Sequence, residues 1–179
     1  MRFDTRTARN LSAGLALLLL PLATAEGAAG AAEAGTRTGT AAAGAAAAAA
    51  GVAYRVQLSN RCLDADTNTI NNNPGKAQVW DCNFAANQRW ILEPSGALRV
   101  DFNNNKCLDA DTNTINNNGG KVQLWSCNGQ PQQTWYRGEN NTIRLSYNGK
   151  CLDHDTNQNH NGGKVQLWTC NGSPQQTWR

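Results

Sequence analysis

Three short segments of the chain alternate apolar with polar residues, which is typical of a β-strand with one buried face. The apolar residues of these segments are Tyr54, Val56 and Leu58, then Leu98, Val100 and Phe102, and finally Ile143, Leu145 and Tyr147. Because successive side chains of a strand point to opposite faces, each segment is expected to bury its apolar side. No stretch has the period of an amphipathic helix, so the pattern predicts an all-β fold.

Each alternating segment leads into three more predicted strands. A polar turn is followed by the sequence Cys-Leu-Asp, which predicts a hairpin. After a loop rich in Asn and Gly, a third strand reads Lys-Ala-Gln-Val-Trp in the first copy and Lys-Val-Gln-Leu-Trp in the other two, and a fourth begins at a Gln-Xaa-Trp triplet. Three groups of four strands give twelve predicted strands.

These groups are internal repeats, assigned to residues 54–96, 97–140 and 141–179. Their first cysteines recur with periods of 45 and 44 residues, and the copies contain all six cysteines and all six tryptophans of the chain. A four-strand period near this length also describes a propeller blade, but propellers typically have about four to eight blades. Three units predict a β-trefoil instead, a threefold barrel capped by hairpins. The second tryptophan of each copy is then expected to pack near the axis: Trp90, Trp135 and Trp178.

The first 25 residues have the three-part layout of a secretory signal peptide. Arg2, Arg6 and Arg9 precede the apolar run of residues 11–20, and small residues follow at Ala23 and Ala25. A membrane anchor is the alternative, but an apolar run of ten residues is about half of the roughly 20 that span a bilayer. We therefore expect cleavage after Ala25 and a secreted protein without membrane insertion.

Residues 26–53 are almost entirely Ala, Gly and Thr, with no large apolar side chain before Val52. Such a segment cannot form a core, so we expect a disordered linker, whose alanine run leaves its local conformation open. Removal of residues 1–25 would leave 13 basic and 12 acidic residues, a formal charge of +1. This balance, with Lys and Arg scattered along the chain, argues against nucleic acid or an anionic membrane as the main partner.

Six cysteines in a secreted chain of this size predict three disulfides. Because each copy carries its own pair, 20, 20 and 19 residues apart, the pairing is expected within copies. The predicted bonds are Cys62 with Cys82, Cys107 with Cys127, and Cys151 with Cys170. A structural zinc site is the alternative, but the pairs are not Cys-Xaa-Xaa-Cys and only the third copy has histidines.

The motif set of each copy resembles the ricin B-chain-like (R-type) lectins, also classed as carbohydrate-binding module family 13. The set is Cys-Leu-Asp, a Gln-Xaa-Trp with a cysteine two residues on, and a second Gln-Xaa-Trp, and the resemblance covers residues 54–179. In that family the sugar is held by the Asp of Cys-Leu-Asp, by the Gln and aromatic residue of the third strand, and by an Asn-Gln pair at the second Gln-Xaa-Trp. The resemblance thus implies these sugar-binding residues: Asp64, Gln78, Trp80, Asn87 and Gln88; Asp109, Gln123, Trp125, Gln132 and Gln133; and Asp153, Gln166, Trp168, Gln175 and Gln176.

The residue types themselves suit a sugar. Gln123 and Trp125 are two apart on one strand and point to the same face, away from the core residue Leu124. An indole can stack on the C–H face of a sugar ring, and Asp109 offers an ionised acceptor for two adjacent hydroxyls. An alternative role, holding the backbone in place, is open for three of the residues: Gln88, Gln133 and Gln176.

The three copies differ in ways that rank them. Only the first has Asn at the fourth site position, Asn87, whereas Gln132 and Gln175 are one methylene longer. The third copy lacks one loop residue and has His154 where the other two have alanine. We therefore expect the first copy to bind best, and the third to be the first to fail.

Parts of the pattern are compatible with three other functions. Asp64, Asp66 and Asn68 share the spacing of the first EF-hand calcium ligands, but Thr69 stands where that loop needs Gly. Asp64 and Asp66 also form a carboxylate pair, as in glycosidases, but neighbours on one strand cannot lie on both sides of a glycosidic bond. A β-trefoil that binds proteins or inhibits a protease, without binding sugar, is the third alternative.

We therefore predict a secreted, monomeric, non-enzymatic lectin without metal or cofactor. Its up to three shallow sites are expected to be weak singly and to gain avidity on a polysaccharide. Galactosides and xylan are the common ligands of the family that the motifs resemble, and are the expected partners. An accessory carbohydrate-binding module of a glycoside hydrolase system is the alternative setting.

Overall fold

Ten short β-strands and five 3₁₀ helices form the fold in the computed structural model, which describes residues 50–103 and 105–179. The strands are β1 (Cys62–Ala65), β2 (Gly75–Trp80), β3 (Trp90–Leu92), β4 (Leu98–Val100), β5 (Lys106–Ala110), β6 (Gly120–Ser126), β7 (Trp135–Arg137), β8 (Ile143–Leu145), β9 (Cys151–His154) and β10 (Gly163–Trp168). The helices are η1 (Ala86–Gln88), η2 (Pro131–Gln133), η3 (Glu139–Asn141), η4 (Thr156–Gln158) and η5 (Pro174–Gln176). Within these residues no helix has the length and apolar character needed to cross a membrane. The predicted signal peptide and nearly all of the predicted linker lie outside the described residues.

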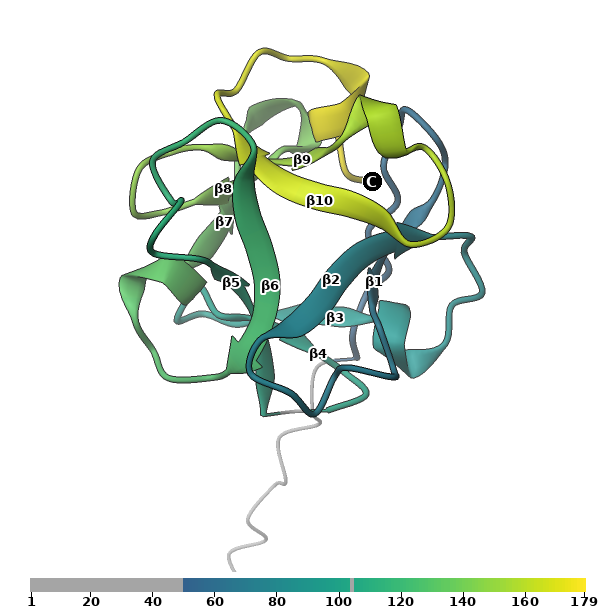
Figure 1. The fold of residues 1–179 in the computed structure, drawn as a ribbon, viewed down its shortest axis with the longest axis vertical. Coiled ribbons are helices and arrows are strands. Elements are labelled where there is room, and N and C mark those ends of the chain that lie inside the picture. Colours follow the sequence, from purple (N-terminus) through teal and green to yellow (C-terminus); the bar gives the residue numbers. More distant parts are fainter. Residues whose placement is uncertain (1–49, 104) are drawn as a thin grey trace, which may run out of the picture. The chain divides into compact units, whose positions relative to one another are not determined.

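Three antiparallel hairpins, one from each repeat, meet on one side of the domain. They are β1–β2, β5–β6 and β9–β10. Their second strands also pair with one another, β2 with β6, β6 with β10 and β10 with β2, and so form a closed triangle (Figure 1). The hairpin register places three Asp-Gln pairs directly opposite each other: Asp64 and Gln78, Asp109 and Gln123, and Asp153 and Gln166.

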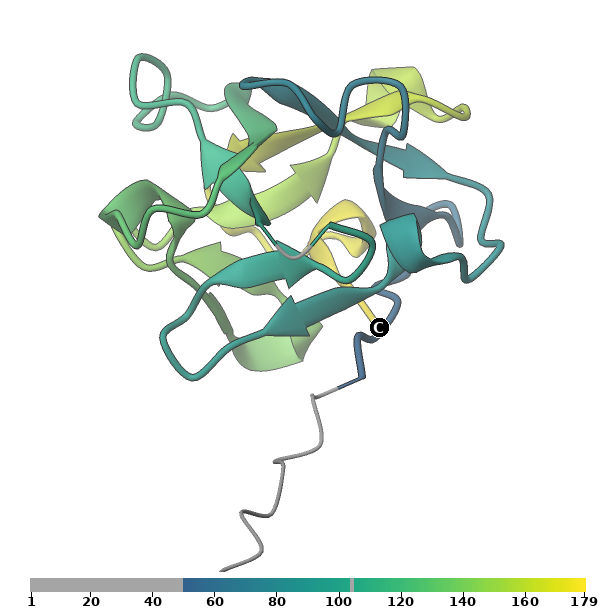
Figure 2. The same cartoon turned by 90° about the horizontal axis from the view of Figure 1, so that it is seen from below.

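The remaining strands form the barrel, in which each repeat pairs with the next. β3 pairs with β4, and β7 pairs with β8. The third junction joins the two ends of the domain: Val56 bridges to Trp178, and Arg55 and Arg179 exchange backbone hydrogen bonds of 2.7 and 2.8 Å. Figure 2 shows the C-terminal residue beside the segment that follows residue 50. The threefold arrangement is therefore closed by residues from opposite ends of the domain, as a β-trefoil requires.

The strands at the two ends of the domain are shorter than the sequence pattern predicted. Ten of the twelve predicted strands are regular, and the first and last are reduced to isolated bridges in the described chain. Val52, which the pattern placed in the linker, pairs with Trp90 and so belongs to the fold. The third apolar residue of each alternating segment is exposed, because the chain turns at that point: Leu58, Phe102 and Tyr147.

The second tryptophan of each repeat lies in the core, as the repeat pattern predicted. Trp90, Trp135 and Trp178 are at most 1% exposed. Each indole N–H donates to a backbone carbonyl of its own repeat, at 3.0 Å to Leu63, 2.9 Å to Leu108 and 2.9 Å to Leu152. The ring is thus buried without leaving its polar atom unpaired, which is the condition for a stable buried indole.

The three predicted disulfides are confirmed. Each bond joins the first strand of a hairpin to the residues just after its second strand, with Cα–Cα distances of 5.1, 5.1 and 5.2 Å. None of the cysteines in the described chain is free. Because every thiol is used in a disulfide, the alternative of a zinc site built on these cysteines is excluded.

An asparagine in the hairpin loop of each repeat fastens that repeat to its neighbour. The amide oxygen of Asn73 accepts a hydrogen bond of 3.0 Å from the Ser126 backbone N–H and one of 2.7 Å from the Lys106 ammonium group. The equivalent oxygen of Asn118 accepts from Thr169, and that of Asn161 from Asp81, each at 2.8 Å. Each hairpin loop is therefore held against the second strand of the neighbouring hairpin.

Candidate functional site

Each hairpin places an aspartate, a glutamine and a tryptophan around one surface hollow. In the first repeat the Gln78 amide donates to Asp64 Oδ1 at 2.9 Å, and both residues are 4% exposed. Trp80, two residues further along β2, is 40% exposed and forms a wall. The sequence placed the glutamine and tryptophan on the same face, and they do share it, but the glutamine lies buried at the floor beside the carboxylate.

The same arrangement recurs in the other two repeats. Gln123 donates to Asp109 Oδ1 at 2.9 Å, and Gln166 donates to Asp153 Oδ1 at 3.1 Å. The three hollows have volumes of about 570, 520 and 180 Å³ in chain order. Twelve of the fifteen predicted sugar-binding residues line them: Asp64, Gln78, Trp80 and Asn87 the first, Asp109, Gln123, Trp125 and Gln132 the second, and Asp153, Gln166, Trp168 and Gln175 the third.

The other three predicted residues lie behind the carboxylates and do not line a hollow. Gln88 is fully buried, and its amide nitrogen donates to Asp64 Oδ2 at 3.0 Å and to the Asp81 carbonyl at 3.1 Å. Its amide oxygen accepts from the Asn83 backbone N–H at 2.9 Å. Gln133 and Gln176 make the equivalent bonds. These glutamines therefore hold both the aspartate and the turn that follows the second strand, in line with the alternative role that the sequence left open.

Asn87 makes the first site different from the other two. Its amide nitrogen donates to Asp64 Oδ2 at 2.9 Å and to the Ala65 carbonyl at 3.2 Å. Gln132 and Gln175 make no such bond to their aspartates among the described residues. A carboxylate has about four acceptor positions, so Asp64, with three protein donors, has fewer left for a ligand than Asp109 or Asp153. The first site is thus more firmly positioned but less open as an acceptor.

Burial raises the pKa of all three aspartates above the ordinary value of 3.8. Hydrogen bonds from the paired glutamines act in the opposite direction on the pKa but do not offset the loss of solvation. Burial disfavours the ionised form, and donors to the carboxylate favour it. Each site therefore contains a carboxyl group that two or three amides orient and that is protonated more readily than an exposed aspartate.

We expect carbohydrate binding to be lost on acidification at a pH above 3.8, while the domain stays folded. A protonated carboxyl group accepts fewer and weaker hydrogen bonds than a carboxylate does. Between the unfolded and the raised folded pKa the folded state holds more protons, so the contribution of these groups to stability grows as the pH falls. Across the acidic pH range, isothermal titration calorimetry measures the loss of sugar binding and circular dichroism measures whether the domain stays folded. If binding is unchanged until the domain unfolds, the carboxylates are not the acceptors.

The sites are composite, because the hairpin loop of a neighbouring repeat borders each hollow. Asn161 and Gly162 of the third repeat line the first hollow, and Pro74 of the first repeat lines the second. A Cβ atom built on Gly119 would lie 3.9 Å from the Trp168 ring, so the loop of the second repeat lies against the third site. Sequence spacing within one repeat could not reveal this contribution, since it depends on which repeats become neighbours.

A second aspartate of each copy also lines its hollow. Asp66, Asp111 and Asp155 each begin an Asp-Thr-Asn sequence whose members border the site. Asp66 Oδ1 accepts from the backbone and side-chain nitrogens of Asn68 at 3.1 and 3.2 Å, which stabilises the turn. The threefold recurrence of the Asp-Thr-Asn sequence is the signal by which these residues can be found. No group of three or more His, Cys, Asp or Glu side chains in the described chain is suited to hold a metal ion.

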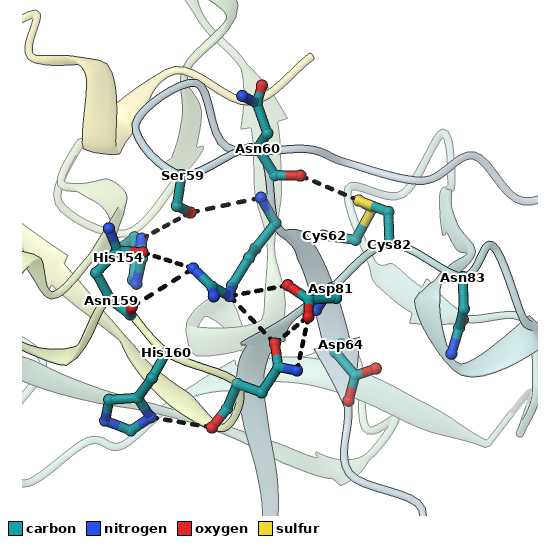
Figure 3. A network of polar contacts seen from close by, with 12 residues as sticks. Ser59, Asn60, Cys62, Asp64, Asp81, Cys82, Asn83, His154, Asn159 and His160 are labelled. Carbon is teal, nitrogen blue, oxygen red and sulfur yellow. Dashed lines mark hydrogen bonds and ion pairs between the residues drawn. A yellow bond between two sulfur atoms is a disulfide. The ribbon is translucent and has the colours of Figure 1, made fainter.

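The third site is the smallest, and His154 lies in the strand that carries its aspartate. His154 is fully buried, with its ring nitrogens 3.4 Å from Ser59 Oγ and 3.2 Å from the Gln158 carbonyl. Figure 3 shows His154 and Asn159 of the third repeat close to Ser59 and Asp81 of the first. The histidine thus occupies the junction between the two ends of the domain.

We expect stability to fall as the pH drops from about 7.5 to about 5.5, and this fall to be absent in His154→Ala. Burial lowers the pKa of His154 below 6.5; Arg61 lowers it too, while the Gln158 carbonyl, Asp153 and Asp155 act in the opposite direction. The unfolded state therefore binds the proton first, and the stability present above pH 6.5 is lost as the pH falls through the lowered value. Chemical denaturation at each pH gives the free energy of unfolding, and its slope against pH measures the effect of the histidine. The cavity that alanine leaves lowers stability at every pH, so the slope separates the two effects. A slope equal in both proteins would contradict the assignment.

Comparison with known proteins identifies the family to which this site belongs. A model of the ricin-type beta-trefoil lectin domain matches residues 51–178, which is most of the chain. The chain belongs to the ricin-type β-trefoil lectin family. No curated protein matches the sequence. The ricin-type domain is a carbohydrate-binding, non-catalytic fold, so this protein carries a carbohydrate-binding lectin domain.

Solved structures share the ricin-type fold at low sequence identity. The designed threefold-symmetric protein ThreeFoil has a TM-score of 0.61 and 22% identity, with 71% of this chain and 94% of that chain covered. The C-half of the earthworm R-type lectin, in complex with GalNAc, has a TM-score of 0.57 and 20% identity, with 71% and 94% covered. The β-trefoil lectin of the Vibrio vulnificus hemolysin/cytolysin, with N-acetyl-D-lactosamine bound, has a TM-score of 0.57 and 22% identity, with 74% and 94% covered. These similarities establish the β-trefoil fold.

Proposed function

We propose that this ricin-type domain binds galactose-containing glycans through the hollows of its three repeats, and that the protein acts outside the cell. The observation that carries the proposal is the threefold recurrence of a buried, amide-oriented carboxylate beside an exposed tryptophan. The carboxylate accepts hydrogen bonds from two neighbouring hydroxyls of the sugar, and charge-assisted bonds of this kind are roughly twice as strong as neutral ones. The indole takes the C–H face of the ring.

Two further observations support the ligand class and the setting. Two similar structures are described as complexes with GalNAc and with N-acetyl-D-lactosamine, both of which contain a galactose-type ring. Three disulfides in one small domain are characteristic of proteins that fold in oxidising compartments, which supports export of the chain. Xylan is the second ligand to be tested, since a carboxylate acceptor beside an indole would also bind other sugars with adjacent hydroxyls.

A glycan array that includes galactosides and xylan fragments tests the proposal, run with and without free-sugar competition and with and without EDTA. We expect binding to galactose-terminated glycans, its displacement by free galactose, and no effect of EDTA. Binding to xylan fragments alone would replace the ligand class but keep the lectin function. Failure of every free sugar to displace the protein from any target would favour the protein-binding alternative, and loss of binding in EDTA would favour a calcium-dependent site.

A further inference from the structure

Phe84 occupies a backbone position that the other two repeats fill with glycine. Its φ is 57°, and the equivalent residues Gly129 and Gly172 have φ values of 68° and 75°. A left-handed backbone is unfavourable for a bulky residue and costs glycine little. A Cβ atom built at either glycine meets no atom within 4 Å, so the position faces open space. The first repeat thus carries a strained aromatic residue where no core packing requires one.

The surrounding hydrogen bonds impose this conformation. The Gln88 amide oxygen accepts from the backbone N–H groups of Asn83 and Phe84 at 2.9 and 3.2 Å. The Arg89 guanidinium donates to the Phe84 carbonyl at 3.2 Å, and Asn83 accepts from the Ala85 backbone N–H at 2.9 Å. The turn is therefore rigid, and it presents a phenyl ring that is 59% exposed. Strain that the surrounding structure enforces, without a packing gain, points to a role in binding.

The loop that carries Phe84 borders the first hollow. Asn83, immediately before it, and Asn87, three residues later, both line this hollow, and Trp80 forms its wall. Phe84 itself lies outside the lining residues. Phe84 therefore stands in the loop between two lining residues, beside the first hollow and not inside it.

We propose that Phe84 forms an aromatic subsite for the second sugar of a glycan bound at the first site. The proposal rests on the proposed function and deepens it: the first site recognises at least a disaccharide, whereas the second and third recognise a single terminal sugar. The C–H face of the second ring stacks on the phenyl group, as apolar ring faces do on aromatic side chains. The first site then differs from the other two in the length of the glycan that it binds, and also in having Asn87 where they have glutamine.

The test uses a protein in which only the first site is intact, Asp109→Ala with Asp153→Ala, and compares it with the same protein carrying Phe84→Gly. Galactose and the disaccharide lactose are titrated by calorimetry, and thermal unfolding is followed in parallel. We expect Phe84→Gly to weaken lactose binding about 3- to 10-fold, the range for one aromatic contact, and to leave galactose binding unchanged. It should also raise the melting temperature, because glycine relieves the strained φ. Tyr147→Ala, another exposed aromatic residue, should change neither affinity.

The reverse change provides a second arm. Gly129→Phe, in a protein in which only the second site is intact, is expected to lower the melting temperature and to raise the ratio of lactose to galactose affinity. Equal affinity ratios before and after Phe84→Gly would overturn the subsite while leaving the lectin function in place. Absence of binding by any sugar, in every variant and in the unmodified protein, would overturn the proposed function and the subsite with it.

Discussion

Replacement of Asp64, Asp109 and Asp153 together by alanine is expected to abolish polysaccharide binding, whereas Asp64→Ala alone should weaken it only modestly. Each aspartate is the charged acceptor of its hollow, and two or three amide donors orient it. With three weak sites on one domain, simultaneous engagement raises avidity by roughly 10²- to 10⁴-fold. Loss of one site removes part of this gain, and loss of all three removes the binding itself.

The triple variant should remain folded. Burial raises the pKa of these carboxylates, so their charged form is a burden on the folded state at neutral pH. Gln78, Gln123 and Gln166 line open hollows, where water can replace the lost acceptor. Gln88, Gln133 and Gln176 lie behind the carboxylates, and each keeps a backbone carbonyl as an acceptor. Near-ultraviolet circular dichroism and the melting temperature test the fold, and pull-down on insoluble polysaccharide measures the binding.

A control variant changes the net charge equally at carboxylates that line no hollow: Glu93→Ala, Asp101→Ala and Glu139→Ala. It should bind the polysaccharide as the unmodified protein does, because the expected loss depends on position and not on total charge. Undiminished binding by the folded triple variant at Asp64, Asp109 and Asp153 would refute the assignment of the sites.

Trp135→Ala and Trp125→Ala, two substitutions in the same repeat, are expected to have different effects: the first on stability and the second on sugar binding. Trp135 is 1% exposed and bonded to the Leu108 carbonyl at 2.9 Å. Its loss should lower the free energy of unfolding by about 3–5 kcal/mol, and the unpaired carbonyl adds to the cost. Against a typical total of about 5–15 kcal/mol, this leaves the domain marginal or unfolded.

Trp125 is only partly buried and lines the second hollow. Trp125→Ala should therefore lower the free energy of unfolding much less than Trp135→Ala does, and should weaken sugar binding at the second site. Guanidinium denaturation with the disulfides intact measures the change in stability. Calorimetry on a protein with only the second site intact measures the change in sugar binding. If both variants lost stability equally, the division between packing and ligand-facing tryptophans would be wrong.

Most of the fold could be predicted from the repeated sequence. The alternation at Leu98 and Val100 predicted a strand, and the threefold period predicted the trefoil. The disulfide pairs followed from one cysteine pair in each copy, because local pairing within a repeat is the simplest arrangement that three equivalent units can share. The pattern overestimated the length of the alternating segments, since Leu58, Phe102 and Tyr147 lie in turns, which a period of two does not detect.

The composition of the sites was only partly predictable. The spacing of Asp109 and of the Gln123–Trp125 pair identified residues that a hairpin register brings together, because strand pairing is a local consequence of the loop between them. The same spacing could not show that Gln133 lies behind the carboxylate and outside the hollow. Its role depends on the η2 turn and on the carbonyl that it meets, and neither is visible in the sequence letters.

The sequence by itself determined the repeated unit, its disulfides, its core tryptophans and the kinds of side chain at each site. Those features are properties of one copy, and local pairing and burial are sufficient to produce them. The tertiary structure alone decided that Gly162 borders the first site and Pro74 the second, and that His154 lies at the junction of the two ends. These features depend on closure of the threefold ring, which brings together residues that no spacing along the chain relates.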